Sequence, residues 1–302
     1  MNLIMEPGIV MSFDDFRKRF KHNAIAIDGY VNEPPRYDMQ DRLFNLNHHD
    51  GCSRLGTRAT CAQALMVARM GLGIHLHHEF KVCADDCDED VCLTCSIFGK
   101  IWQAEQLYNP LLNKLVDYED KLDATCGSYP VKCNDPSFLE ICWVFEPYRS
   151  FRSLGGLEFG DSEQYLGVVD DVGSRIEKYL VGKAKKARLK IDYEVLSKTS
   201  KVAVIKEIGA QCRYRIFEDG IDLYLAARPA QNGNNVVTII KKSPFVNIDL
   251  IALTARLNEF EGVSLDGLSK WGGGDMVIGS PRAIGTHLPI EEIAQLVGAF
   301  RK

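Results

Sequence analysis

The sequence lacks any uninterrupted apolar run of the roughly 18 to 20 residues that a membrane-spanning helix needs. Its N-terminus also lacks the basic region followed by an apolar stretch that is typical of a secretory signal. Positive charge is not in excess, because 36 Lys and Arg residues stand against 41 Asp and Glu residues, for a formal net charge of −5. No global positive field is therefore available to hold a long nucleic acid. We expect a cytoplasmic protein with no membrane contact that binds any polyanion locally.

Patterns of structural zinc and of disulfides are also missing, although the chain has ten cysteines. Most of them lie in apolar segments, as small core residues do. Cys83, Cys87, Cys92 and Cys95 form a cluster in the sequence, but the pairs lack the short-loop spacing of a zinc knuckle. Disulfide frameworks are typical of small secreted chains rather than of one with 302 residues. We therefore expect neither kind of cross-link.

Apolar strand-like and helix-like segments alternate in the first half of the chain. Residues 24–27, 43–46 and 80–84 are short apolar runs typical of buried strands, and residues 57–70 and 90–103 have the pattern of buried helices. This alternation predicts a mostly parallel sheet. Ligands of such sheets bind at the carboxyl ends of the strands.

The second half of the chain has a different character. Apolar residues at three- and four-residue intervals predict a long connector helix over residues 161–187. Beyond it, strand-like segments separated by turn signals are followed by two helical segments, the last one opened by Pro289. The predicted strands are residues 202–208, 212–217, 221–227 and 236–240. We therefore predict an α/β protein in which a domain with a mostly parallel sheet (residues 1–160) precedes the connector and a smaller α+β domain (residues 188–302).

Acidic and histidine side chains cluster where the predicted strands end. The clusters are Asp28; Asn47-His48-His49-Asp50; Asp86-Cys87-Asp88-Glu89-Asp90; and Asp117 with Asp120 and Asp123. Carboxylates gathered at the end of a buried strand repel one another unless positive charge lies among them. Oxygen ligands with a few imidazoles suit Mn²⁺ or Mg²⁺. Two such ions about 3.5 to 4 Å apart can activate a water molecule and bind a phosphoryl oxygen, which is the chemistry of phosphate-ester hydrolysis.

Each cluster also has a simpler interpretation. Asp28 can be a turn former or a helix cap, and the adjacent His48 and His49 can be surface residues. The acids of residues 86–90 can be the solvated first turn of a helix, where negative charge is favourable. Asp117, Asp120 and Asp123 fall in a polar, helix-like stretch and can form a solvated face.

The residues around the histidine pair resemble the DHH phosphoesterase family. Asn47-His48-His49, followed by Thr57-Arg58-Ala59-Thr60-Cys61-Ala62 and an apolar helix, is similar to the family's third motif. Asp28 looks like the aspartate of its second motif. The segment 86–91 resembles the first motif, which normally comes earliest in the chain but here follows the histidines.

Two explanations of this order stay open. Either the N-terminal domain is circularly permuted, or the acidic run is the family's late single-aspartate motif and the first motif is absent. Permutation accounts for more residues and leaves Asp123, with Asp117 as the runner-up, for the late motif. The resemblance then implies a set of metal ligands that consists of Asp28, His48, His49, Asp88, Asp90 and Asp123. The chain departs from the family pattern at Asn47, which replaces an aspartate, and at Ala84, which replaces a histidine.

A weaker match lies near the C-terminus. Trp271-Gly272-Gly273-Gly274-Asp275 followed by Gly279-Ser280-Pro281-Arg282 resembles the glycine-rich substrate loop of the family's accessory domain. Glycines let backbone N–H groups approach an anion, and arginine can pair with phosphate through two hydrogen bonds.

The sequence thus predicts a hydrolase that cleaves a phosphate ester or anhydride in an interdomain cleft with Mn²⁺ or Mg²⁺, two ions in number. His49 and Asp88 are the predicted catalytic residues. The predicted substrate contacts are Arg58, Gly272, Gly273, Gly274 and Arg282. The substrate class is a nucleotide or short oligonucleotide, and a homo-oligomeric state stays open. The alternatives are a degenerate member of the same fold that binds a nucleotide without cleaving it, and an oligomeric scaffold whose acids are surface charge.

Overall fold

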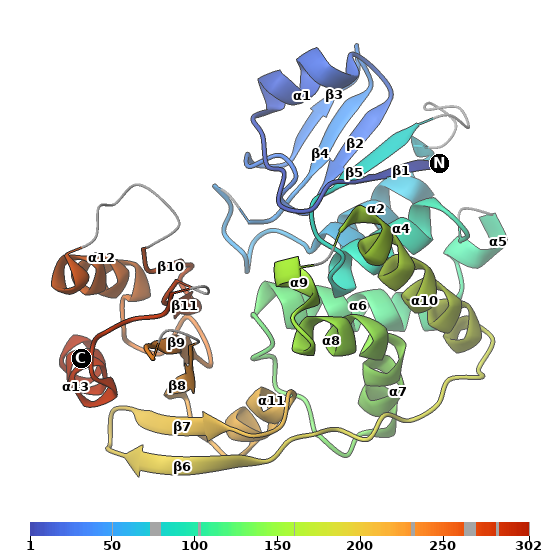
Figure 1. Cartoon of the computed structure of the whole chain (residues 1–302). Helices are drawn as coiled ribbons and strands as arrows, with labels where there is room; N and C mark the ends of the chain where they lie inside the picture. Colours follow the sequence, from blue (N-terminus) through green and yellow to red (C-terminus); the bar gives the residue numbers. More distant parts are fainter. Residues whose placement is uncertain are drawn as a thin grey trace. The chain divides into compact units, whose positions relative to one another are not determined.

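The computed structural model describes residues 1–49, 51–72, 80–101, 104–159, 161–230, 233–262, 270–281 and 284–301 (Figure 1). The chain forms two compact units. The first comprises Met1–Ala124 and Asn134–Arg188, and the second comprises Thr125–Cys133 and Leu189–Lys302. Arg282, one of the predicted substrate contacts, and Asp50 lie outside the described residues.

The first unit contains a five-stranded sheet with the order β1-β5-β2-β4-β3. Strands β1, β5, β2 and β4 are parallel to their neighbours, whereas β3 pairs antiparallel with β4 at one edge. The strands are β1 (Asn2–Met5), β2 (Ala24–Ile27), β3 (Arg36–Asp38), β4 (Leu43–Leu46) and β5 (Lys81–Ala84). The central strands end at the same edge, since Ile27 is in register with Leu46 and Ala26 with Cys83.

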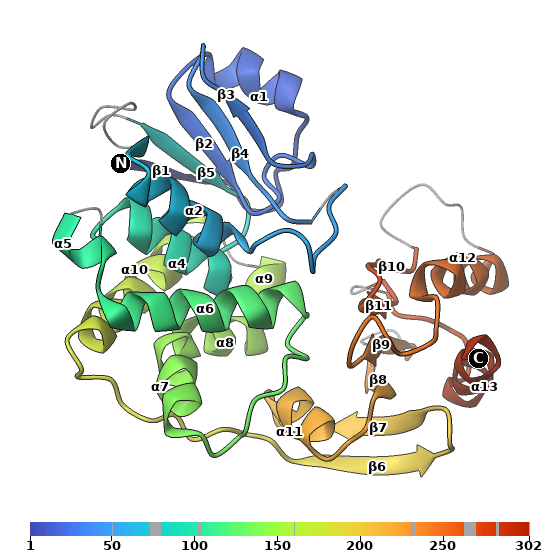
Figure 2. The ribbon, with the colours of Figure 1, turned by 180° about the vertical axis from the view of Figure 1, so that it is seen from behind.

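Alternate residues of the buried strands face two different cores. Ala24 and Ala26 of β2 pack with the phenylalanines of α1 (Phe13–Phe20). Ile25 and Ile27 pack on the other side, in the larger core. Figures 1 and 2 show α1 on one face of the sheet and the other helices of this unit beyond the opposite face. Burial on both sides explains why β2 is apolar at all four positions.

The other helices of the first unit form a helical layer beside the sheet. They are α2 (Thr60–Arg69), α4 (Glu89–Phe98), α5 (Ala104–Leu107), α6 (Pro110–Ala124), α7 (Pro136–Val144), α8 (Glu146–Ser153), α9 (Gly156–Phe159) and α10 (Ser162–Leu180). Helix α10 corresponds to the helix predicted over residues 161–187, but it ends at Leu180 and packs against α4, α7 and α8 within the first unit.

The second unit is built on a six-stranded mixed sheet with the order β10-β11-β9-β8-β7-β6. Strands β7 and β8 are parallel, and the other neighbours are antiparallel. The elements of this unit are β6 (Tyr193–Lys198), β7 (Ala203–Glu207), α11 (Cys212–Glu218), β8 (Leu223–Pro229), β9 (Asn235–Lys241), α12 (Leu250–Glu261), β10 (Gly272–Gly273), β11 (Val277–Gly279) and α13 (Ile290–Phe300).

One predicted strand of this unit is wrong. Residues 212–217 form most of the helix α11, because Cys212 and Ile216, four residues apart, share a buried face with Phe217. The fold class itself is confirmed: a mostly parallel sheet with helices forms the first unit, and a mixed sheet with helices forms the second. Among the described residues, no helix is long and apolar enough to cross a bilayer.

The glycine run of the second unit offers a test of local packing. Gly273 has a φ of +134°, and a Cβ atom there would lie 2.3 Å from the carbonyl oxygen of Val277. We expect Gly273→Ala to lower the free energy of unfolding by about 1 to 3 kcal/mol, the usual scale of enforced backbone strain.

The adjacent glycine is the matched control. A Cβ atom at Gly274 would meet no atom within 4 Å, so Gly274→Ala should change stability by less than about 1 kcal/mol. Urea unfolding of both variants checks the pair, and equal losses would contradict the packing described for Gly273.

Candidate metal centre

The ends of two neighbouring strands and two helices bring the acidic and histidine residues together. Asp28 follows β2, the pair His48 and His49 follows β4, and Asp90 lies in the first turn of α4, shortly after β5. Asp123 comes from the last turn of α6. The carboxyl ends of β5, β2 and β4 lie side by side in the sheet, which is where parallel sheets bind ligands.

The ring of His48 lies at the centre of this group. Its Nε2 atom is 2.7 Å from Oδ2 of Asp123, 3.3 Å from Oδ1 of Asp28 and 3.8 Å from Oδ2 of Asp90. One ligand atom from each of these four residues lies within 4.8 Å of all the others. Asp28, His48 and His49 form a second group of the same kind. The residues thus offer three carboxylates and two imidazoles to a shared space.

Burial makes this group costly without a cation. The side chain of His48 is fully buried, and those of Asp28 and Asp90 are 3% and 1% exposed. Both ring nitrogens of His48 and Oδ2 of Asp123 lack a hydrogen-bond partner of normal geometry among the described residues. Buried polar atoms are nearly always partnered. A metal ion would partner Nε2 and Oδ2, so the donor set fits a divalent cation.

The pKa values of the site reflect the crowding of negative charge. Burial lowers the pKa of His48, but the carboxylates of Asp123 and Asp28 outweigh it and raise this pKa to about 11. Burial and the charge of Asp28 raise the pKa of Asp85 and of Asp90 to about 7. Burial and the same charge raise the pKa of Asp88 well above its usual range. Burial would also raise the pKa of Asp28, but its contacts with the two histidines lower it below its usual range.

Groups at the start of α2 hold two of the carboxylates in place. The two oxygens of Asp90 accept hydrogen bonds of 2.6 Å from the N–H groups of Thr60 and Cys61 at the start of α2. A helix N-terminus is a favourable place for a negative charge. Asp28 has a left-handed φ of 50° and lies 3.3 Å from the hydroxyl of Thr60. The start of α2 therefore fixes both acids.

Asn47 shapes the turn that carries the histidines and offers no ligand atom. Its Oδ1 accepts hydrogen bonds from the N–H groups of His48 and His49. Its Nδ2 donates to the carbonyl oxygens of Val31 and Glu33. An aspartate could not make the last two bonds, because it has no donor when ionised. Asparagine at this position is thus required by the local backbone.

The other predicted residues that the structure describes lie outside the two groups of close ligand atoms. Asp88 is the N-cap of α4, where one of its oxygens accepts from the N–H of Val91, and it is not in the two groups of close ligand atoms. Arg58 lies 3.6 Å from the carboxylate of Asp120, with 60% of its side chain exposed. Asp117 is exposed and pairs with Lys121 on the same helix. Gly272 and Gly273 form β10, and the N–H of Gly274 donates to Val277 in the turn that follows.

Sequence reasoning missed two residues next to the site. Arg54 donates to the main-chain oxygen of Asp123 over 2.8 Å and to Nδ1 of His49. Nothing in the spacing of the loop indicated this contact. Glu119 is 4% exposed, and its Oε2 atom lacks a hydrogen-bond partner among the described residues. Its position was a usable signal, because it falls on the apolar face of α6 with Leu115 and Leu122.

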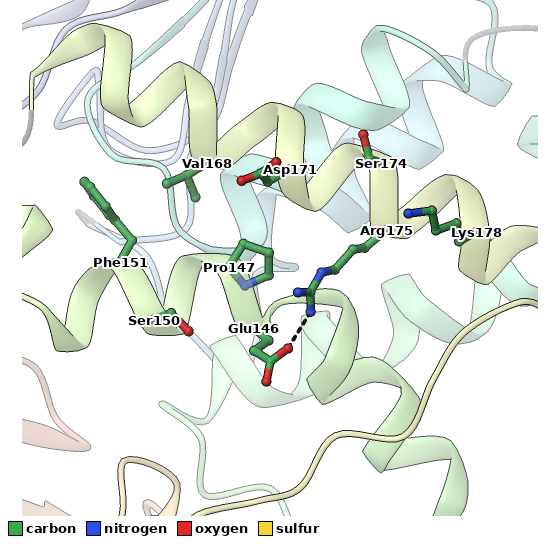
Figure 3. A pocket seen from close by; sticks show the side chains of 9 residues that line it. All are labelled: Glu146, Pro147, Ser150, Phe151, Val168, Asp171, Ser174, Arg175 and Lys178. Carbon is green, nitrogen blue, oxygen red and sulfur yellow. Dashed lines mark hydrogen bonds and ion pairs between the residues drawn. The ribbon is translucent and has the colours of Figure 1, made fainter.

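A cavity of about 520 Å³ lies elsewhere in the first unit, between α8 and α10 (Figure 3). Arg175 points across it and pairs with Glu146 at 2.7 Å. Asp171 and Lys178 add one charge of each sign to its wall. The charges of this cavity are therefore balanced, unlike those around His48.

No model of a known protein family matches this chain, and no curated protein matches it. The chemistry of the candidate metal centre is therefore what indicates a function.

The raised pKa values predict how the metal-free chain responds to pH. Asp85 and Asp90 have a usual pKa of 3.8 and a folded pKa of about 7. Their contribution to stability is thus fully present below about pH 4 and is lost as the pH rises through about 7. His48, with its pKa raised to about 11, loses its contribution above about pH 6.5, the usual pKa of histidine, and therefore acts in the same direction.

We therefore expect the metal-free chain to melt at a lower temperature at pH 8 than at pH 6. A saturating divalent ion should reduce this difference, because it offsets the carboxylate charges. Calorimetry of the chelator-treated protein provides the measurement, with Asp117→Asn as a control that keeps the full pH dependence. An unchanged melting temperature between pH 6 and pH 8 would contradict the burial of these charges.

Proposed function

We propose that this chain is a divalent-metal-dependent phosphoesterase. The observation that carries the proposal is the group formed by Asp28, His48, Asp90 and Asp123, which come from four different segments of the chain and present their ligand atoms within 4.8 Å of one another. Charged side chains of this kind are almost never fully buried unless they are paired or bind a metal. Three carboxylates with imidazole suit Mn²⁺ or Mg²⁺.

The resemblance to the DHH phosphoesterases adds support. Five of the six ligands that it implies belong to the two groups of close ligand atoms: Asp28, His48, His49, Asp90 and Asp123. Asp90 comes from the acidic run after β5, and Asp123 comes from α6. Because both join the same group, the permuted order of motifs accounts for the site better than a missing first motif does.

The residues of the chain have distinct parts in this proposal. Asp28, His48, Asp90 and Asp123 would hold the first ion, and Asp88, whose pKa is raised by burial and by Asp28, Asp86 and Asp123, would serve a second one. Bound divalent ions supply an activated water and neutralise the charge of the phosphoryl oxygens. Arg58 is proposed as a phosphate contact near the start of α2. The contacts that the resemblance implies at Gly272, Gly273, Gly274 and Arg282 stay predictions.

A second candidate is a protein of the same fold that binds a nucleotide without cleaving it. Asn47 favours it, because its side chain is used entirely in bonds to the backbone and supplies no carboxylate. Ala84, fully buried at the end of β5, likewise offers no ligand atom.

Turnover of a generic phosphodiester, bis(p-nitrophenyl) phosphate, with Mn²⁺ tests the proposal. We expect Asp90→Asn and Asp123→Asn each to lower kcat by at least about a hundredfold, on the scale of losing one preorganised electrostatic contact. Asp117→Asn is the matched control and should stay within a few-fold, since Asp117 is an exposed partner of Lys121. If the chain shows no turnover but binds a nucleotide tightly in the presence of Mn²⁺, the enzyme proposal is wrong. The second candidate, a protein that binds a nucleotide without cleaving it, then takes its place.

Asp88 needs a variant that separates capping from metal binding. Serine preserves the N-cap hydrogen bond to Val91 but removes the carboxylate. We expect Asp88→Ser to melt within a few degrees of the unaltered chain and to lose at least about a hundredfold in kcat. A variant that keeps full activity would restrict Asp88 to the role of a helix cap.

A further inference from the structure

Arg54 connects two members of the metal centre. It lies in the loop between the histidine pair and α2, and 20% of its side chain is exposed. Its Nη1 atom donates to the main-chain oxygen of Asp123 over 2.8 Å and lies 3.4 Å from Oδ1 of the same residue. Its Nη2 atom donates to Nδ1 of His49. One guanidinium thus holds a carboxylate and a ring together.

These contacts determine where His49 carries its hydrogen. A guanidinium has only donors, so Nδ1 of His49 must be the acceptor of the pair. The other nitrogen, Nε2, lies 2.8 Å from Oδ1 of Asp28 and must then carry the hydrogen and donate to that carboxylate. A ring turned over would place carbon atoms against both partners. The two neighbours therefore select one orientation and one tautomer.

This tautomer is the wrong one for binding a metal through Nε2. A neutral histidine that binds a metal through Nε2 carries its hydrogen on Nδ1 and normally donates it to an acceptor. Here Nδ1 of His49 faces Nη2 of Arg54, which is a hydrogen-bond donor and not an acceptor. Nε2 of His49 thus cannot become a ligand atom while Arg54 stays on the ring. His48 has no such obstacle among the described residues, because its Nδ1 has no hydrogen-bond partner there.

We propose that Arg54 is a positioning residue that exchanges His49 for a phosphate oxygen of the substrate. When Nε2 of His49 turns to a metal ion, its hydrogen moves to Nδ1 and the guanidinium leaves the ring. The Nη2 donor that leaves the ring then binds a phosphate oxygen through a charge-assisted hydrogen bond, while Nη1 stays beside Asp123. Phosphate binding therefore follows metal binding. This inference rests on the proposed function, because it assumes a metal at the site.

Nuclear magnetic resonance of the ring nitrogens of the unaltered chain tests the first step. Zn²⁺ is the probe, because it is diamagnetic and binds imidazole. Without metal, we expect His49 to show a bare Nδ1 and a protonated Nε2, and with Zn²⁺ we expect the hydrogen on Nδ1. This measurement needs no variant, so it tests the proposal even if a substitution at Arg54 prevents folding.

Calorimetric titration with inorganic phosphate tests the second step. We expect the Mn²⁺-loaded chain to bind phosphate at least about tenfold more tightly than the metal-free chain, since a released guanidinium adds a charge-assisted hydrogen bond. Arg54→Ala should lower the phosphate affinity of the Mn²⁺-loaded chain roughly tenfold to a hundredfold while Mn²⁺ binds as tightly as before or more tightly. Arg54→Lys should restore part of the phosphate affinity. Lys121→Ala, which removes a cation paired with Asp117 on α6, should change neither affinity.

The outcomes separate this inference from the proposed function. If Arg54→Ala weakens Mn²⁺ and phosphate binding equally, Arg54 only supports Asp123 and the inference is wrong. If the hydrogen stays on Nε2 of His49 after Zn²⁺ binds, the inference is also wrong, but the metal centre stands. If the unaltered chain binds neither Zn²⁺ nor Mn²⁺, the proposed function and the inference fail together.

Discussion

The repulsion between the carboxylates of Asp28 after β2, Asp90 after β5 and Asp123 on α6 is the constraint on which the rest of the first unit depends. Asp28 and Asp90 are buried, and Asp123 reaches the same ring of His48 from α6. Water cannot screen these charges, so the surrounding structure must supply positive potential. It does so with the imidazole of His48, with the N–H groups that begin α2, and with Arg54. All of these groups thus stabilise the negative charge of the buried carboxylates.

Much of the sheet was predictable because short parallel strands that are buried on both faces have a strong sequence signal. Residues 24–27 and 43–46 form β2 and β4 as predicted, and their polar successors lie at the carboxyl edge. Strand β1 was not predicted, because its first residues are only half buried and it depends on pairing with β5. In α11, alternating arginines imitated the period of a strand, although Cys212 and Ile216 bury one face of a helix.

The site was predictable to the extent that it follows from strand ends. Asp28 directly follows β2, His48 and His49 follow β4 after Asn47, and Asp90 follows β5 at a short distance. The spacing could not reveal that Asp90, rather than Asp88, lies within 4.8 Å of the others, because this depends on which carboxylate meets the start of α2. The role of Arg54 depends on the path of an irregular loop, which no periodicity encodes. Glu119 was detectable as a charge on an apolar helix face.

The close ligands around His48 come from segments that are far apart along the chain. Asp28 follows β2, whereas Asp123 ends α6, and several elements lie between them. We expect these distant segments to come together late in folding, because the closure entropy of long loops opposes their contact. A partly folded chain therefore has no complete set of ligands. An ion that binds only the complete set slows unfolding and leaves the folding rate almost unchanged, so its benefit to the protein is persistence of the native state rather than speed of reaching it.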